Sequence, residues 1–360
     1  MTKSTCSVVQ EDFFTTGIQM PARKKALEEN RAYSVSIKLT EKCSGGCNYC
    51  YINSSEQGER YLDAERVFKL IEEIKEIRAE MILWHGGDPL LHPKWFEFSQ
   101  YAGDIGISVS TLSSGIIPKR EAKRLSQLHQ ANRMETVGLH LDTINPEAYN
   151  QINFQPKTLD LKIQGYYNLL EAGFPPQGIF PILTLTKPVC ETIEETIDWF
   201  VDEMGAKDIC FCTFEPAGFG NINSHLEPSI ADLQRACEYR AKRLGEHYLR
   251  IGTTDVGSLL CRTYFGITFN GDVIPCVQLP ELSMGNIYEK GLKEIFDSRR
   301  DEILFNFDVH GPCAHCKNSD VCYGCRASAY HYLGDIKASD PKCWLNTEAK
   351  AYSAKKNFNK

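Results

Sequence analysis

The sequence contains no apolar run long enough to cross a membrane. A membrane-spanning helix needs roughly 18 consecutive apolar residues, and no stretch of this 360-residue chain approaches that length. The first residues, MTKSTCSVVQEDFF, also lack the continuous apolar stretch of a secretory signal peptide. We therefore expect a cytoplasmic protein that does not associate with membranes.

Positive charge is scarce as well. The chain has 40 Lys and Arg residues against 47 Asp and Glu residues, which gives a formal net charge of -7 at pH 7. A surplus of negative charge offers no general attraction to nucleic acid or to an anionic lipid surface. We therefore expect no nucleic-acid partner.

Cysteine, in contrast, is abundant. The 15 cysteines are an odd number in a chain without an export signal, so metal binding or redox chemistry explains them better than a framework of disulfides. Three of them fall between Cys43 and Cys50, and seven fall between Cys261 and Cys343. This clustering predicts two separate regions that carry chemistry.

From residue 34 to residue 213 the chain alternates between short apolar strands and amphipathic helices. Six strands that alternate with helices predict an α/β fold, a parallel sheet curled into a partial (β/α)6 barrel of the TIM type. Chemistry in such a barrel lies at the carboxyl ends of the strands. The predicted strands are 34–39, 81–84, 107–112, 136–141, 178–183 and 208–213. The predicted helices are 62–78, 94–102, 119–128, 159–172 and 193–204.

The chain divides into five predicted parts. A polar leader (1–32) precedes the barrel (33–225), and the Gly- and Asn-rich segment EPAGFGNIN lies at the end of that barrel. A bridging helix and linker (226–258) lead to a cysteine-rich domain (259–345), which a tail (346–360) follows. In the cysteine-rich domain the apolar periodicity breaks down, as expected where metal ligation replaces apolar burial.

The first cysteine region is a CxxxCxxC loop. Cys43, Cys47 and Cys50 come directly after the first predicted strand, in the segment TEKCSGGCNYCY. Three thiolates on one loop can bind three irons of a 4Fe-4S cluster and leave the fourth open, and two glycines let the backbone fold around the cluster. An open iron can chelate S-adenosylmethionine (SAM), and Tyr49 is placed to pack beside adenine. A zinc knuckle or free thiols are the alternatives.

This loop at the end of the first barrel strand resembles the signature of the radical SAM superfamily, and the resemblance covers residues 33–225. It implies reductive cleavage of SAM to a 5'-deoxyadenosyl radical. Gly86, Gly87, Asp88 and Pro89 follow the second strand and resemble the family's GGEP motif, whose backbone receives the SAM amino group, with Asp in place of the usual Glu. A simple turn is the other interpretation of these residues.

Further strand ends carry the remaining candidates for SAM binding. Ser113 and Ser114 follow the third strand, and His140 and Asp142 end the fourth, where the resemblance places the ribose and carboxylate of SAM. Capping of the following loops by Ser and Asp is the alternative interpretation. The fifth strand, which ends at Leu183, resembles the segment that flanks adenine in relatives.

The second cysteine region contains seven cysteines in an order that resembles the SPASM domain, an extension of many radical SAM enzymes. The resemblance implies two auxiliary 4Fe-4S clusters. It assigns Cys261, Cys276 and Cys325 to an inner cluster nearer the active site. The outer cluster takes Cys313, Cys316, Cys322 and Cys343. A zinc-binding ribbon is the alternative for the whole region.

Seven cysteines leave the inner cluster one ligand short. Relatives with full ligation carry another cysteine a few residues before the first, and here that stretch reads TTDVGSLL, with Asp255 as the one candidate ligand. Either Asp255 completes the cluster or one iron stays open. The other cysteines lack metal spacing and are interpreted as core residues, which applies to Cys6, Cys190, Cys210, Cys212 and Cys237.

The resemblance implies an enzyme that uses one radical SAM cluster, two auxiliary clusters and SAM to remove hydrogen from an unactivated carbon. Its first predicted role is maturation of a peptide or protein side chain, with an electron donor such as flavodoxin or ferredoxin. The alternative is oxidation or decarboxylation of a small molecule such as a tetrapyrrole, because CYGCRASAY and GDIKASDPKC resemble the ends of heme-pathway relatives. A zinc-stabilised binding protein without catalytic activity is the third possibility.

Overall fold

The strand β1 (Ser34–Lys38) pairs with strands from both halves of the chain. The computed structural model describes residues 20–253, 255 and 257–349. Within that part of the chain, eight strands form one sheet in the order β6-β5-β4-β3-β2-β1-β7-β8. All neighbours are parallel except β7 and β8. The further strands are β2 (Met81–His85), β3 (Ser108–Ser113), β4 (Val137–His140), β5 (Ile179–Leu185), β6 (Cys210–Thr213), β7 (Tyr264–Ile267) and β8 (Val273–Ile274).

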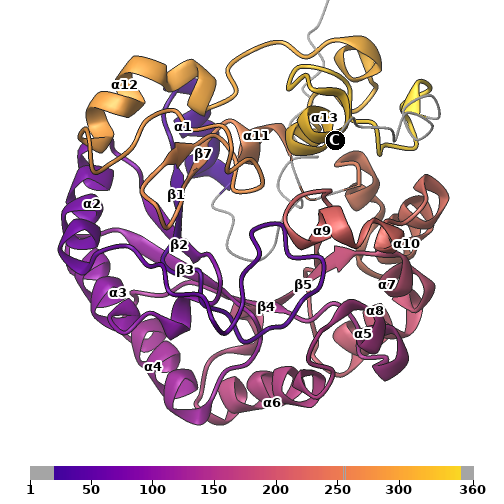
Figure 1. Cartoon of the computed structure of the whole chain (residues 1–360), viewed down its shortest axis with the longest axis horizontal. Coiled ribbons are helices and arrows are strands. Elements are labelled where there is room, and N and C mark those ends of the chain that lie inside the picture. The colour runs from indigo at the N-terminus through magenta and orange to yellow at the C-terminus, as the bar shows by residue number, and fades with distance from the viewer. Residues whose placement is uncertain (1–19, 254, 256, 350–360) are drawn as a thin grey trace, which may run out of the picture.

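Helices surround the outer side of this curled sheet (Figure 1). The predicted α/β partial barrel is confirmed, and its six strands and five helices lie within a few residues of their predicted positions. The sequence did not predict α1 (Met20–Glu28), α5 (Pro146–Ile152) or α7 (Lys187–Glu191). The helices of the barrel are α2 (Ala64–Glu76), α3 (Trp95–Asp104), α4 (Lys119–Gln130), α6 (Thr158–Glu171) and α8 (Ile193–Asp202).

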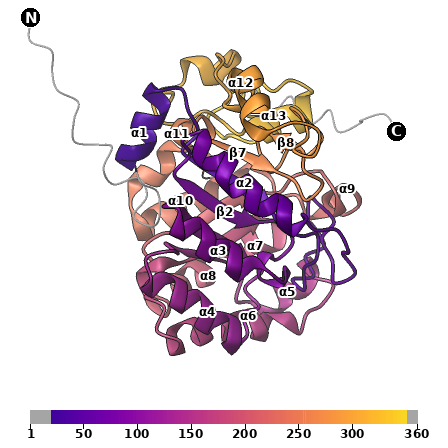
Figure 2. The ribbon, with the colours of Figure 1, turned by 90° about the vertical axis from the view of Figure 1, so that its left-hand side faces the viewer.

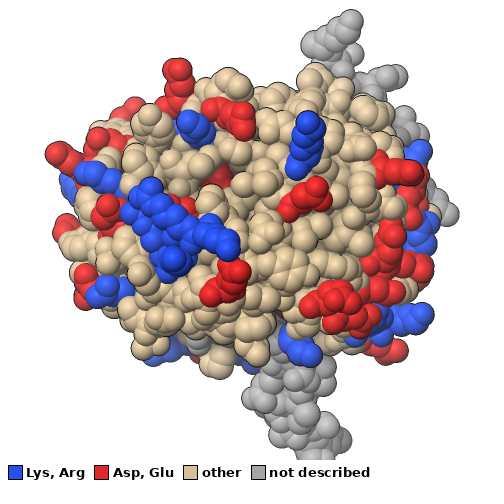
Figure 3. All heavy atoms as spheres, turned by 90° about the horizontal axis from the view of Figure 1, so that it is seen from below, with Lys and Arg blue, Asp and Glu red and all other residues tan. Residues whose placement is uncertain are grey.

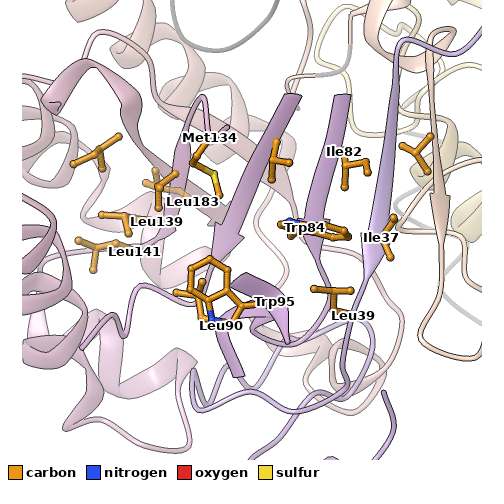
Figure 4. Close-up of a cluster of buried hydrophobic side chains, with 14 of the residues drawn as sticks. Ile37, Leu39, Ile82, Trp84, Leu90, Trp95, Met134, Leu139, Leu141 and Leu183 are labelled. Carbon is orange, nitrogen blue, oxygen red and sulfur yellow. The ribbon is translucent and has the colours of Figure 1, made fainter. Parts of the chain in front are cut away.

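The two faces of the sheet have different environments. Side chains alternate between the two faces along each strand. Ile37 of β1, Trp84 of β2 and Leu183 of β5 point to the helices and are fully buried there (Figure 4). Each large apolar side chain buried in this way contributes about 1.5–3 kcal/mol. The intervening residues face the interior of the barrel and are half-buried at Leu83, His85, Leu112, His140, Phe180, Cys210 and Cys212. The interior face is therefore where other groups can be bound.

The cysteine-rich part of the chain joins the barrel instead of standing apart from it. Its strand β7 pairs with β1 in register from Ser34 opposite Tyr264 to Ile37 opposite Ile267. The helices α12 (Leu292–Ile303) and α13 (Arg326–Leu333) both lie on the side of the molecule that is uppermost in Figure 1 and Figure 2, toward the left and the right of Figure 1 respectively. The linking elements are α9 (Phe219–Ile222), α10 (Ile230–Leu244) and α11 (Ser258–Cys261).

Charge of both signs covers the face of the molecule drawn in Figure 3, with basic side chains gathered on the left and acidic ones on the right. The helix α4, which lies lower left in Figure 1, has the sequence KREAKRLSQLHQ, and α8 on the right has IEETIDWFVD. This face therefore has no surface of a single sign. In the described part of the chain, none of the helices combines the length and the apolar character that crossing a membrane requires.

Candidate iron-sulfur and SAM site

The CxxxCxxC loop leaves the carboxyl end of β1 and folds tightly around its own thiols. A Cβ added to Gly45 would lie 3.2 Å from Cys43 Sγ and 3.8 Å from Cys47 Sγ, so both thiols turn toward the same stretch of backbone. The Gly45 amide donates to Cys43 Sγ at 3.3 Å. Gly46 has a φ of +70° and would place a Cβ 2.6 Å from Asn153 Oδ1. These contacts explain why two glycines occupy the loop, and they leave a cradle suited to a cluster.

The glycines after β2 pack directly on the strand end that leads into this loop. The Gly87 amide donates to Thr40 O and the Asp88 amide donates to Lys42 O, both at 2.7 Å. A Cβ on Gly87 would lie 2.2 Å from Lys42 O, which no side chain can satisfy without moving the backbone. The Gly-Gly-Asp-Pro segment is therefore fixed against the cysteine loop and is more than an isolated turn.

Asp88 gathers the two serines that the sequence selected at the end of β3. Its Oδ2 accepts from Ser113 Oγ at 3.1 Å, from the Ser114 amide at 3.1 Å and from Ser114 Oγ at 2.5 Å. Burial raises the pKa of the carboxyl, although these donors and the Leu90 amide oppose the shift. Ser114 Cβ would be 3.3 Å from a Cβ on Gly45, so the whole group lies beside the cysteine loop.

A second polar group joins the loop to β4 and β5. Tyr49 Oη donates to Asp142 Oδ2 at 2.6 Å, and His140 Nε2 lies 3.0 Å from Asp142 Oδ1. The Thr184 amide donates to the same Oδ1 at 2.8 Å. Burial, followed by the charge of Asp142, raises the pKa of Tyr49 well above its usual value, so the phenol stays protonated. Tyr49, His140 and Asp142 are thus brought together as neighbours.

Leu183 does not belong to this group. Its side chain is fully buried among the residues that face the helices (Figure 4), whereas its neighbour Thr184 faces the interior. The difference follows from the two-residue period of a strand, since adjacent residues point to opposite faces. The Leu183 side chain therefore points away from the interior, and the predicted place of this strand end beside adenine stays a prediction.

Lys162 is a site residue that the sequence analysis missed. It comes from α6, is 1% exposed, and donates from Nζ to His140 O at 2.9 Å. Burial lowers its pKa, but Cys47, Tyr149 and Asp142 outweigh that effect and the pKa is raised. Lysines are mostly exposed, so nothing in the sequence of a surface-covering helix marks this one as buried.

The four cysteines of the predicted outer set line a single hollow. Cys313, Cys316, Cys322 and Cys343 share it with Arg250, Gly252, Asn318, Gly324, Asp340 and Leu345. Backbone amides point at the sulfurs: the Asp340 amide donates to Cys313 Sγ and the Gly324 amide to Cys322 Sγ, both at 3.4 Å. Such amide contacts are typical of cluster-binding thiolates, whose potential they tune.

The three cysteines of the predicted inner set lie elsewhere, in one apolar cluster. Cys261 and Cys325 are buried there with Leu279 and Phe305, and Cys276 packs against them. Cys325 also caps α13, since its Sγ accepts from the Ser328 amide at 3.4 Å. Across the described ranges, no three Cys, His, Asp or Glu side chains converge closely enough to hold a single metal ion.

The two carboxylate oxygens of Asp255 differ in their hydrogen bonds. Its Oδ2 accepts from Arg240 Nη1 and from the Phe211 amide, both at 2.7 Å. Its Oδ1 is buried and has no hydrogen-bond partner among the described residues. Burial raises the pKa of this carboxyl while Arg240 opposes the shift. Ligation of iron through Oδ1 stays a prediction, and the ion pair with Arg240 is a structural role that the sequence did not reveal.

Cys210 and Cys212 are not core residues as predicted. Both lie on the interior face of β6 and are half-buried, while Phe211 between them is fully buried against the helices. The prediction rested on the absence of metal-ligand spacing around these two cysteines. The open barrel interior makes only one face of this strand part of the core.

A buried charge network, also unpredicted, links the end of β6 to α13. Glu215 accepts from Ser328 Oγ at 2.7 Å, and its other oxygen lies 2.9 Å from His331 Nδ1. His331 Nε2 in turn lies 3.0 Å from Glu281 Oε1. The two carboxylates outweigh burial and raise the pKa of His331 to about 9. The network fastens the cysteine-rich region to the mouth of the barrel.

Comparison with protein families agrees with both cysteine regions. The model of the Radical SAM superfamily matches residues 37–200, and that of SPASM, an iron-sulfur cluster-binding domain, matches residues 261–317. An AdoMet-dependent heme synthase of Methanosarcina barkeri is 25% identical over 86% of this chain and 95% of its own length. The PqqA peptide cyclase of Streptomyces rochei is 25% identical over 86% of this chain and 88% of its own.

Solved structures show the same fold at lower sequence identity. Native anSMEcpe with bound AdoMet superposes with a TM-score of 0.69 and 18% identity, covering 89% of this chain and 96% of the other. Streptococcus suis SuiB bound to S-adenosylmethionine superposes with a TM-score of 0.65 and 17% identity, covering 90% and 81%.

Proposed function

Because the chain belongs to the radical SAM superfamily and is a radical SAM enzyme with a C-terminal SPASM domain, we propose that it removes hydrogen from an unactivated carbon of a peptide or protein side chain. When bound, the cluster and SAM supply a 5'-deoxyadenosyl radical for this step. Cys43, Cys47 and Cys50 hold the cluster. The chain's remaining task is to orient SAM and substrate and to exclude water.

The observation that carries this proposal is the attachment of two polar groups to the cysteine loop itself. The backbone of Gly86 and Gly87 receives the SAM amino group, and Asp88 with its two serines fixes that backbone. Tyr49 and Asp142 form the other group beside the same loop. Lys162 adds a buried positive charge that suits the carboxylate of SAM.

The cysteine-rich region holds two auxiliary 4Fe-4S clusters in this proposal. The hollow lined by Cys313, Cys316, Cys322 and Cys343 supports the outer site. The shared apolar cluster of Cys261, Cys276 and Cys325 supports the inner site. These clusters accept an electron or anchor the substrate, and a flavodoxin or ferredoxin supplies the electron that the radical cluster needs.

Similarity to the PqqA peptide cyclase supports a peptide substrate. A tetrapyrrole substrate is the second candidate, because similarity to heme synthases extends over nearly the whole of one such relative. Similarity to an Fe-coproporphyrin III synthase of Methanosarcina barkeri, 23% identical over 93% of both chains, points the same way.

The experiment tests the cluster chemistry first and the identity of the substrate second. Anaerobically purified protein is assayed for iron, sulfide and dithionite-dependent release of 5'-deoxyadenosine from SAM. Candidate precursor peptides encoded beside the gene and Fe-coproporphyrin III are then added in parallel. We expect a mass change in a peptide. A change in the porphyrin alone would favour the second candidate, and protein without iron or SAM cleavage would overturn the proposal.

A further inference from the structure

Lys38 is a buried cation on the interior face of the sheet. It ends β1, lies in register with His85 of β2 and is 1% exposed. Its ammonium donates to Val277 O at 2.7 Å and lies 4.9 Å from the centre of the Tyr51 ring. Within the described residues it forms no ion pair with a carboxylate.

A buried charge without a counter-charge is costly, so an anion is expected near Lys38. Glu281 is the acidic side chain whose charge raises the pKa of Lys38, but its carboxylate lies 3.0 Å from His331 Nε2 and already pairs with that residue. Burial lowers the pKa of Lys38 to about 8, and the thiols of Cys276 and Cys50 oppose this shift more strongly than Glu281 does. The counter-charge is therefore to be found at these cysteines.

The contacts of Lys38 place it between the two cysteine groups. Tyr51, whose ring it faces, directly follows Cys50 of the radical loop, and Val277, whose oxygen it binds, directly follows Cys276 of the inner auxiliary set. The ammonium thus bridges the segments that carry one ligand of each site.

Lys162 is likewise a buried cation, and it lies beside the CxxxCxxC loop. Its ammonium is buried, binds His140 O and lies 5.5 Å from the centre of the Tyr149 ring. Burial lowers its pKa, whereas Cys47, Tyr149, Asp142 and Cys43 raise it, and no carboxylate of the described chain forms an ion pair with it.

Arg326 is a buried cation beside the outer hollow, and its charge acts on the buried carboxylate of Asp340 there. The residue is 2% exposed, and three backbone oxygens accept from its guanidinium, while Nη2 has no partner among the described residues. A Cβ on Gly324 would lie 2.9 Å from that Nη2 and 3.1 Å from Cys313 Sγ, so the guanidinium and the thiol lie against the same residue.

We propose that Lys38, Lys162 and Arg326 are counter-charges for the iron-sulfur clusters, and that Lys38 is shared by the radical cluster and the inner auxiliary cluster. The inference rests on the proposed function, which supplies the clusters. A 4Fe-4S cluster held by thiolates carries net negative charge, and reduction adds one more. A nearby cation stabilises the reduced form more than the oxidised form, so its removal lowers the midpoint potential.

The test uses Lys38→Met, which removes the charge, and Lys38→Arg, which keeps it. Arg23→Met is the matched control, because Arg23 is also buried, forms no ion pair with a described carboxylate and donates to Ser34 at the opposite end of β1. Each substitution is made in the intact chain and in a Cys43→Ala, Cys47→Ala, Cys50→Ala background, which leaves the auxiliary clusters alone. Iron content and EPR-monitored redox titrations are measured without oxygen.

We expect Lys38→Met to shift the potentials of the radical and inner auxiliary clusters downward, with Lys38→Arg and Arg23→Met at the wild-type values. A Lys38→Met protein that titrates like the Arg23→Met protein, or shifts upward, overturns the proposal. If Lys38→Met loses iron, retention by Lys38→Arg supports a counter-charge, whereas equal loss overturns it. Wild-type protein without iron would instead overturn the proposed function.

Discussion

In the proposed function the three thiols of the CxxxCxxC loop each bind a different iron, so none can replace another. We expect Cys43→Ala, Cys47→Ala or Cys50→Ala to abolish release of 5'-deoxyadenosine. Iron content should fall by about one cluster's worth, because the auxiliary sites lie on other segments. Cys190→Ala is the control, since Cys190 is fully buried among apolar residues. Release of 5'-deoxyadenosine by the loop variants would contradict the assignment.

Asp255 combines a structural role with a predicted role as ligand. Asp255→Ala leaves Arg240 as a buried unpaired charge, which we expect to cost about 3–5 kcal/mol of the free energy of unfolding. The double variant Asp255→Ala, Arg240→Met removes both charges and should recover most of that loss. Thermal unfolding and iron content are measured together. Iron lost in both variants supports ligation, and iron restored in the double variant means that the role is structural.

At the scale of elements, α13 is fastened to the barrel by a protonated imidazole. The pKa of His331 is raised to about 9, above its unfolded value of about 6.5, so the protonated form stabilises the fold. This contribution is complete below pH 6.5 and is lost as the pH rises toward 9, an effect on the order of 3 kcal/mol. The free energy of unfolding, measured by denaturation at several pH values between about 6 and 9.5, should therefore fall less steeply with pH for His331→Gln than for wild type.

His310→Gln provides the comparison for this prediction. His310 also pairs with a carboxylate, Asp335, but its side chain is 61% exposed, so its ion pair should contribute little. If the free energy of unfolding changed with pH by the same amount in the wild type and both variants, the Glu215–His331–Glu281 network would add no pH-dependent stability.

Much of the fold was predictable because local patterns repeat. Strand and helix periods located β1 to β6 and five helices, and the resemblance to the SPASM domain grouped the outer four cysteines, which line one hollow. It was harder to predict which residues of a strand face the interior of the barrel and which face the helices. Leu183 and Thr184 are adjacent, and only the curvature of the sheet decides which of them faces the interior.

Buried cations and long-range strand pairing were not predictable from local sequence. A lysine in a strand or helix normally lies in water, so Lys38 and Lys162 carry no local mark of burial. The pairing of β7 with β1 joins residues about 230 positions apart, from Ser34 and Tyr264 onward, and no pattern within either strand encodes it. The residues that were missed are therefore those whose role depends on tertiary contact.

On the scale of the whole molecule, β7 protects the edge of the barrel. Without it, β1 would expose a row of unpaired backbone groups and lose its contact with the fully buried Phe265 and Ile267. We therefore expect the fragment 1–258 to aggregate when it is produced alone, whereas the full chain stays monodisperse. Size-exclusion chromatography checks this, and a monodisperse fragment would show that the barrel folds independently.

The hollow lined by the outer cysteines also makes the outer auxiliary site more open to oxygen than the inner one. All four outer cysteines are partly exposed, while Cys261 and Cys325 of the inner set are buried. Oxidation of a thiolate follows its exposure. An ageing preparation should therefore lose its outer auxiliary cluster before the inner one, whereas the partly exposed Cys43, Cys47 and Cys50 give the loop no such protection.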